Sequence, residues 1–96
     1  MSRHREVLSD EEIGARLVTR EHWRREGDTL TRELRFHDFS ESVAFVNRVL
    51  PHAEEIGHHP DLSISWNTVD VSLTTHSCGA ITERDFELAR RIDAVA

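Results

Sequence analysis

The sequence predicts an α+β fold in two layers, in which a four-stranded antiparallel sheet carries three helices on one face. The spacing of apolar residues alternates between helical and strand-like in the order α-β-β-α-β-β-α. A short turn separates the two members of each predicted strand pair, which indicates two hairpins. The predicted strands have an apolar and a polar side, a pattern typical of an antiparallel sheet that is covered on one face only.

The composition indicates one folded, acidic domain. The chain has 96 residues, of which 38% are hydrophobic and 31% charged, enough for one compact core. We expect a flexible N-terminus over residues 1–8 and a single domain over residues 9–96. The formal net charge of −6 disfavours a nucleic-acid partner and an anionic membrane surface.

Three further features bear on the cellular location. No apolar run approaches the ~18 residues that a membrane span needs. The first residues lack the apolar segment of a secretory signal. Cys78 is the single cysteine, which excludes an intrachain disulfide and a thiolate metal cluster. We therefore expect a cytoplasmic protein with no membrane partner.

The first helix has a clear start signal. Ser9 is an N-cap candidate with Glu12 three residues later, and this is the capping-box pattern. Leu8 and Ile13 flank it as a hydrophobic staple. A glycine in the middle weakens the helix, so we expect a short one, over about residues 10–18.

Residues 20–36 are predicted to form the first hairpin. Gly27 and Asp28 supply its turn. Arg32 interrupts the apolar side of the second strand, which is otherwise formed by Leu30, Leu34 and Phe36.

The second helix is predicted to begin near Ser40, an N-cap candidate. Pro51 lies inside its apolar stripe, and a mid-helix proline removes a hydrogen bond, so we expect a kink or a local break there. Gly57 suits the left-handed position that ends many helices. Pro60 restricts the residue before it to extended backbone, so the helix must end by about Gly57.

The second hairpin and the last helix complete the order. A two-residue turn at Asn67 and Thr68 is expected to join two strands with alternating apolar residues. Trp66 continues the apolar side of the first of these strands, so we expect it in the core. Thr82, with Asp85 three residues later, gives a near capping box at the start of the last helix.

Three histidines are placed at the ends of predicted elements. His58 and His59 lie in the loop after the second helix, and His76 lies where the last strand ends. An unperturbed histidine titrates near ~6.5, so three imidazoles in one place can move protons near neutral pH. Adjacent residues in extended backbone point in opposite directions, so we expect different roles for His58 and His59.

Other interpretations stay open from these residues alone. His58 and His59 are equally well explained as two surface histidines. A zinc site is another interpretation, although the spacing fits no familiar zinc pattern. A nucleophile pair of Cys78 and His76 is a third, although no neighbour in the sequence would orient the histidine or activate the thiol.

A longer pattern resembles the signature of the pterin-4a-carbinolamine dehydratases. The pattern is Glu-x3-His-His-Pro-x5-Trp-x9-His-x8-Asp, formed by Glu54, His58, His59, Pro60, Trp66, His76 and Asp85. The likeness covers roughly residues 9 to 93 and includes Trp23, Gly27, Phe36, Phe39, Gly79, Thr82, Ala89, Ile92 and Asp93. The α+β fold of that family agrees with the predicted order of elements.

The resemblance implies an enzyme that dehydrates a 4a-hydroxytetrahydropterin to a quinonoid dihydropterin, in recycling of the pterin that aromatic amino acid hydroxylases use. The reaction requires proton transfer, so no metal and no cofactor are expected. His58 and His76 are implied as the acid–base pair, with His59 binding and orienting the pterin. The implied substrate-binding residues are Glu54, Gly57, Thr74, Thr75, Ser77 and Asp85. Helix capping alone would also explain Asp85.

The resemblance also implies the partners. They are a small pterin molecule and further copies of the chain, in a homodimer or a homotetramer. In this family the second helix and the edge strands help to build the oligomer, so Pro51 bears on assembly. The alternative function is a non-catalytic binding module, because some relatives act as protein partners, for example as dimerisation cofactors of a transcription factor.

Overall fold

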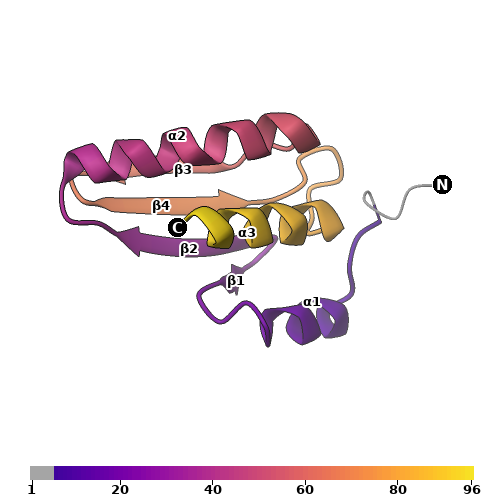
Figure 1. Ribbon diagram of the computed structural model, residues 1–96. Coiled ribbons are helices and arrows are strands. Elements are labelled where there is room, and N and C mark those ends of the chain that lie inside the picture. The colour runs from indigo at the N-terminus through magenta and orange to yellow at the C-terminus, as the bar shows by residue number, and fades with distance from the viewer. Residues whose placement is uncertain (1–5) are drawn as a thin grey trace.

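The computed structural model describes residues 6–96. Its elements, in chain order, are α1 (Asp10–Leu17), β1 (Arg24–Glu26), β2 (Thr29–Arg35), α2 (Phe39–Ile56), β3 (Asp61–Ser65), β4 (Thr68–Leu73) and α3 (Glu83–Val95). This order confirms the predicted α+β fold (Figure 1). Within residues 6–96, no helix combines the length and the apolar character that crossing a membrane requires.

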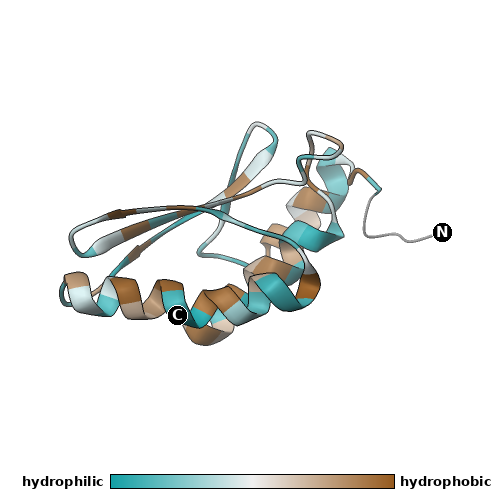
Figure 2. Cartoon of the chain, turned by 90° about the horizontal axis from the view of Figure 1, so that it is seen from above, coloured by the Kyte–Doolittle hydropathy of each residue, from teal (hydrophilic) through white to brown (hydrophobic). Residues whose placement is uncertain are grey.

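The sheet is antiparallel throughout, with the strand order β1-β2-β4-β3. The helices α2 and α3 lie on the same side of it, and α1 lies at the β1 edge (Figures 1 and 2). Apolar side chains on alternate positions of β2 and β4 face these helices, and Leu30 pairs with Leu73 and Leu34 with Val69 across the two strands. The buried Ile13 of α1 joins the same core.

The residues just before α1 are hydrogen-bonded to the residues just before α3. Of the segment predicted to be flexible, residues 1–5 lie outside the described residues. Leu8 is buried, its N–H donates to the Ile81 carbonyl at 3.0 Å, and Val7 forms a β-bridge with Thr82. Ser9 and Glu12 form the predicted capping box, so α1 begins where the sequence placed it.

Helix α2 differs from the prediction at its start, and it contains no break at Pro51. Asp38, and not Ser40, is the N-cap, because the Asp38 side chain accepts a hydrogen bond from the Glu41 N–H. The helix runs unbroken past Pro51. Pro51 and Asn47 are both exposed, so water can reach the Asn47 carbonyl, which lacks a helical donor. The helix ends at Gly57, with φ of 61° and ψ of 34°, as predicted.

The turn of the second hairpin lies one residue earlier than predicted. Ser65 pairs with Thr68, so the turn residues are Trp66 and Asn67. Asn67 is held by Phe36, whose N–H donates to the Asn67 carbonyl at 2.8 Å. The prediction that Trp66 is a core residue is therefore wrong: Trp66 has a φ of 51° and is 66% exposed.

Arg32, which interrupts the apolar side of β2, is accommodated by a carboxylate from the end of α3. Asp93 accepts hydrogen bonds from Arg32, from Arg20 at 2.9 Å and from the Trp23 indole N–H at 2.7 Å. The charge on the core side of β2 is thus paired and hydrogen-bonded, which is the condition for burying it.

Candidate active site

The three predicted histidines line one pocket of about 310 Å³. It is formed by the loop after α2, the loop after β4 and the start of α3. Its lining residues are Gly57, His58, His59, Thr74, Thr75, His76, Ser77 and Arg84. Every predicted site residue therefore lines the pocket except Glu54 and Asp85, and Arg84 is an addition.

Local backbone chemistry fixes both loops. The left-handed Gly57 ends α2, and the His58 N–H then donates to the Ala53 carbonyl at 3.0 Å. The second loop is closed by a bridge between Thr75 and Ala80, in which the Thr75 N–H donates to the Ala80 carbonyl at 3.0 Å. The histidines are thus on short loops whose ends are held by a helix and by the central strand β4.

His58 is the buried member of the three. It is 8% exposed, and its Nε2 lies 2.6 Å from Oδ1 of Asp85, which has no exposed surface. A carboxylate only accepts hydrogen bonds when ionised, so in the neutral ring this contact puts the proton on Nε2 and leaves a lone pair on Nδ1. Within residues 6–96, Nδ1 of His58 has no hydrogen-bond partner.

Asp85 has more roles than helix capping. Its Oδ2 accepts from the Thr82 N–H at 2.9 Å, which completes the capping box of α3, and from the Thr75 hydroxyl at 2.9 Å. The Thr75 and Thr82 hydroxyls are 2.8 Å apart. With His58 on Oδ1, both carboxylate oxygens are engaged, so Asp85 supports the ring from behind and does not line the pocket.

His59 and His76 have exposed surroundings. The Nε2 of His59 lies 2.5 Å from Oε2 of Glu54, one turn earlier on α2. The Nε2 of His76 lies 3.7 Å from Oδ2 of Asp61 on β3, which is too long for a hydrogen bond. Glu54 therefore contacts the pocket through His59. The three rings present three environments: one buried on a carboxylate, one exposed with a carboxylate partner and one open to solvent.

Arg84 was missed by the sequence reasoning. Its Nη2 donates to the carbonyls of Ile56 at 2.8 Å and Gly57 at 2.7 Å, the residues just before the histidine pair. The available signal was its position in the first turn of a helix, where the helix dipole disfavours a positive charge.

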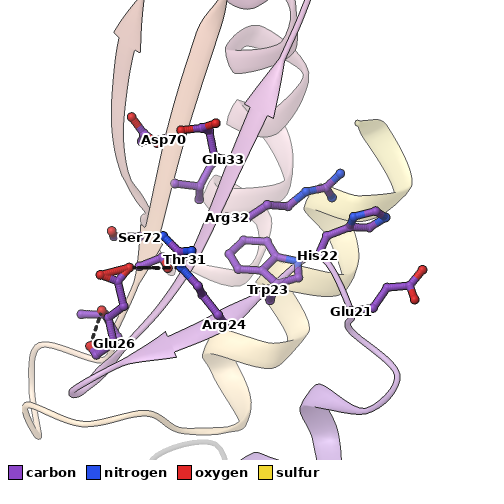
Figure 3. Close-up of a pocket in the computed structure, with 12 residues that line it drawn as sticks. Glu21, His22, Trp23, Arg24, Glu26, Thr31, Arg32, Glu33, Asp70 and Ser72 are labelled. Carbon is purple, nitrogen blue, oxygen red and sulfur yellow. Dashed lines mark hydrogen bonds and ion pairs between the residues drawn. The ribbon is translucent and has the colours of Figure 1, made fainter.

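A larger cavity, of about 610 Å³, lies on the polar face of the sheet (Figure 3). Its lining includes Trp23, His22, Glu33 and Asp70 but none of the predicted site residues. Glu33 and Asp70 are directly opposite each other on β2 and β4. Across residues 6–96, no group of three or more His, Cys, Asp or Glu side chains is arranged to hold a metal ion.

Comparison with known proteins matches almost the whole chain to one family. The family model described as "Pterin 4 alpha carbinolamine dehydratase" matches residues 6–95. A protein from Thermosynechococcus vestitus is 50% identical over 95% of this chain and 96% of its own length. One from Nocardia farcinica is 46% identical over the same shares. Both carry the provisional name pterin-4-alpha-carbinolamine dehydratase.

Two solved structures are similar in fold. The Brucella melitensis protein described as a transcriptional coactivator/pterin dehydratase has a TM-score of 0.91 and 33% identity, over 95% of this chain and 99% of that one. A pterin dehydratase-like protein, described as a RuBisCO assembly factor in the alpha-carboxysome, has a TM-score of 0.66 and 26% identity. That match covers 77% of this chain and 88% of the other.

Proposed function

The chain belongs to the pterin 4 alpha carbinolamine dehydratase family, and we propose that it removes water from a 4a-hydroxytetrahydropterin to give a quinonoid dihydropterin, in tetrahydropterin recycling. The observation that carries the proposal is the pocket in which His58, His59 and His76 meet, with the His58 ring held by the buried Asp85.

The reaction is a proton-transfer problem. The C4a–O bond breaks as the lone pair of N5 expels the hydroxyl group, which leaves as water once a proton is delivered to it. The proton on N5 is then removed, and the C=N bond of the product remains. One acid and one base near the ring are sufficient, and such positioned groups typically contribute ~10²–10⁴-fold to the rate.

His58 suits the base. With Nε2 donating to Asp85, the neutral ring offers the Nδ1 lone pair to a proton on the substrate. The buried carboxylate fixes the tautomer and the orientation of the ring, as the aspartate does in a Ser-His-Asp triad. Asp85 is thus a positioning residue in this proposal.

His76 suits the acid that protonates the leaving hydroxyl. Its side chain is 74% exposed, so it can take up a proton again from water after each turnover. His59, held by Glu54, binds and orients the pterin at the mouth of the pocket. The polar edge of the pterin is assigned to four further lining residues, Gly57, Thr74, Thr75 and Ser77.

Single histidine variants test this assignment. We expect His58→Ala and His76→Ala each to lower the dehydration rate by ~10²-fold or more, because each removes one proton-transfer group. Stopped-flow absorbance of a freshly formed carbinolamine measures the rate, with His22→Ala as the control because His22 lies outside the pocket. Full activity in either variant removes that residue from the mechanism.

The second candidate function is a non-catalytic binding module. The names of the two solved relatives favour it, since one is described as a transcriptional coactivator/pterin dehydratase and the other as an assembly factor. A stable protein partner recovered together with an absence of pterin turnover would reverse the ranking. The three histidines and the buried Asp85 support the dehydratase as the first choice.

Self-association in the cytoplasm is part of the proposal. Several large apolar side chains are exposed on two elements: Phe39 and Leu50 on α2, and Ile64 and Trp66 on the β3–β4 hairpin. Burying such side chains against a second copy of the chain would remove them from water, which is favourable. We therefore expect a homodimer or a homotetramer.

A further inference from the structure

We infer that Arg84 is a positioning residue: it fixes the peptide that leads into His58 and so holds that ring in the pocket. The catalytic part of this inference rests on the function proposed above. Arg84 acts through the backbone of the loop after α2 and not through the side chain of His58.

The end of α2 needs an external donor. The last carbonyl groups of a helix have no partner within the helix, and the last turn of α2 contains no basic residue. Arg84 supplies the donor from α3: its Nη2 lies 2.8 Å from the Ile56 carbonyl and 2.7 Å from the Gly57 carbonyl. Hydrogen bonds from a charged donor are shorter and stronger than neutral ones.

The contact between Arg84 and Gly57 directly affects the position of His58. The Gly57 carbonyl belongs to the peptide that joins Gly57 to His58. Glycine has more backbone freedom than any other residue, so this peptide is the weak point at which the loop would lose its orientation. The hydrogen bond from the Arg84 guanidinium to the Gly57 carbonyl restricts the rotation of this peptide.

Neighbouring residues of α3 hold His58 at two points. Arg84 holds the peptide before it, and Asp85 holds its ring through the 2.6 Å contact with Nε2. Both residues lie in the first turn of α3, so one rigid element fixes both the backbone and the side chain of His58.

Helix stability does not explain an arginine at this position. A positive charge in the first turn faces the positive end of the helix dipole and is unfavourable there. Arg84 forms no ion pair within residues 6–96, unlike Arg91 farther along α3, which lies 3.4 Å from Glu55. Within residues 6–96, its hydrogen-bond partners outside its own helix turn are the carbonyls of Ile56 and Gly57.

Three variants of α3 test the inference. Arg84→Met removes the donors and keeps a long side chain, Arg84→Lys keeps a positive donor, and Arg90→Met is the matched control. Arg90 lies on the same helix, its side chain is 59% exposed, and it does not line the pocket. We expect Arg84→Met to lower kcat by ~10–100-fold, as loss of a supporting residue or a small misplacement does. Arg84→Lys should restore part of the rate, and Arg90→Met should leave it unchanged.

A second readout does not depend on turnover. In ¹⁵N NMR spectra of the imidazole rings, Arg84→Met should shift or broaden the His58 signals, whereas the signals of the distant His22 and the spectrum of Arg90→Met should stay unchanged. Unchanged His58 signals, or an unchanged kcat in Arg84→Met, would overturn the inference. If the wild-type protein itself shows no dehydration, the proposed function fails, and the ring signals alone decide whether Arg84 positions His58.

Discussion

At the scale of single residues, the proposed chemistry depends on the buried carboxylate of Asp85. Asp85 has no exposed surface, and its two oxygens serve His58, Thr75 and the Thr82 N–H together. One side chain therefore contacts the His58 ring and completes the capping box of α3. Removing its charge should affect the ring more than the helix, because an amide oxygen can still cap.

The substitution Asp85→Asn separates these two functions. We expect kcat to fall by ~10²–10⁴-fold, since an amide no longer enforces the tautomer with Nδ1 free. The thermal midpoint should change far less. Asp38→Asn, at the N-cap of α2, is the control for capping, because Asp38 accepts from the Glu41 N–H and lies outside the pocket. A fall in kcat no larger than in the control would remove Asp85 from the support of His58.

At the scale of elements, the site is built where three elements end. Helix α2 stops at Gly57, strand β4 stops before Thr74, and α3 starts at Glu83 after its Thr82 cap. The helix ends leave backbone groups unpaired, and side chains pair with some of them: Arg84 donates to the Ile56 and Gly57 carbonyls, and Thr82 and Asp85 cap α3. The left-handed Gly57 is a constrained point in this arrangement, since other residues disfavour its φ of 61°.

Two glycine-to-alanine substitutions should change stability in opposite directions. Gly57→Ala should destabilise the fold by about 1–2 kcal/mol, because alanine disfavours a positive φ. A Cβ at position 57 would meet only Arg84 Nη2, at 3.7 Å, so the cost is conformational and not a clash. Gly14→Ala, in the middle of α1 with open space around its Cβ, should stabilise by about 0.5–1 kcal/mol.

Urea unfolding of both variants measures these two free energies. If both substitutions changed the free energy of unfolding in the same direction, the left-handed conformation of Gly57 would be contradicted. A loss of activity in Gly57→Ala that exceeds its loss of stability would be consistent with the role of this loop in holding His58.

At the scale of the whole molecule, the sequence predicted correctly those features that depend on residues close together in the chain. The capping boxes of Ser9 with Glu12 and of Thr82 with Asp85 each span three residues, so they are visible in the sequence. The strand alternation and the left-handed Gly57 are equally local. The fold class followed from these patterns, whereas the substrate-binding residues expected around the histidines came from the resemblance to the family.

Contacts between distant residues could not be predicted in this way. The Asp85–His58 contact and the Arg84–Gly57 contact each join residues 27 positions apart. The position of Trp66 depends on how Asn67 is held by Phe36, 31 positions away. A residue that fits the alternating pattern of a strand can thus lie in a turn instead. The distant residue that causes this is not visible in any local pattern.

Self-association is a property of the whole molecule, and it can be tested by a substitution on α2. Leu50→Arg should reduce the size of the particle in light scattering coupled to size-exclusion chromatography, because it puts a charge on the exposed apolar side of α2. Val18→Arg is the control, as Val18 is 79% exposed beyond the end of α1. A wild-type protein that is monomeric at high micromolar concentration would contradict the oligomer.

The most direct test of the central claim is the rate at which the wild-type protein, treated with a chelator, dehydrates a 4a-hydroxytetrahydropterin. The arrangement of His58, His59 and His76 in one pocket predicts a rate well above that of the buffer alone, and its loss in His58→Ala. A folded wild-type protein that leaves the buffer rate unchanged would contradict the claim.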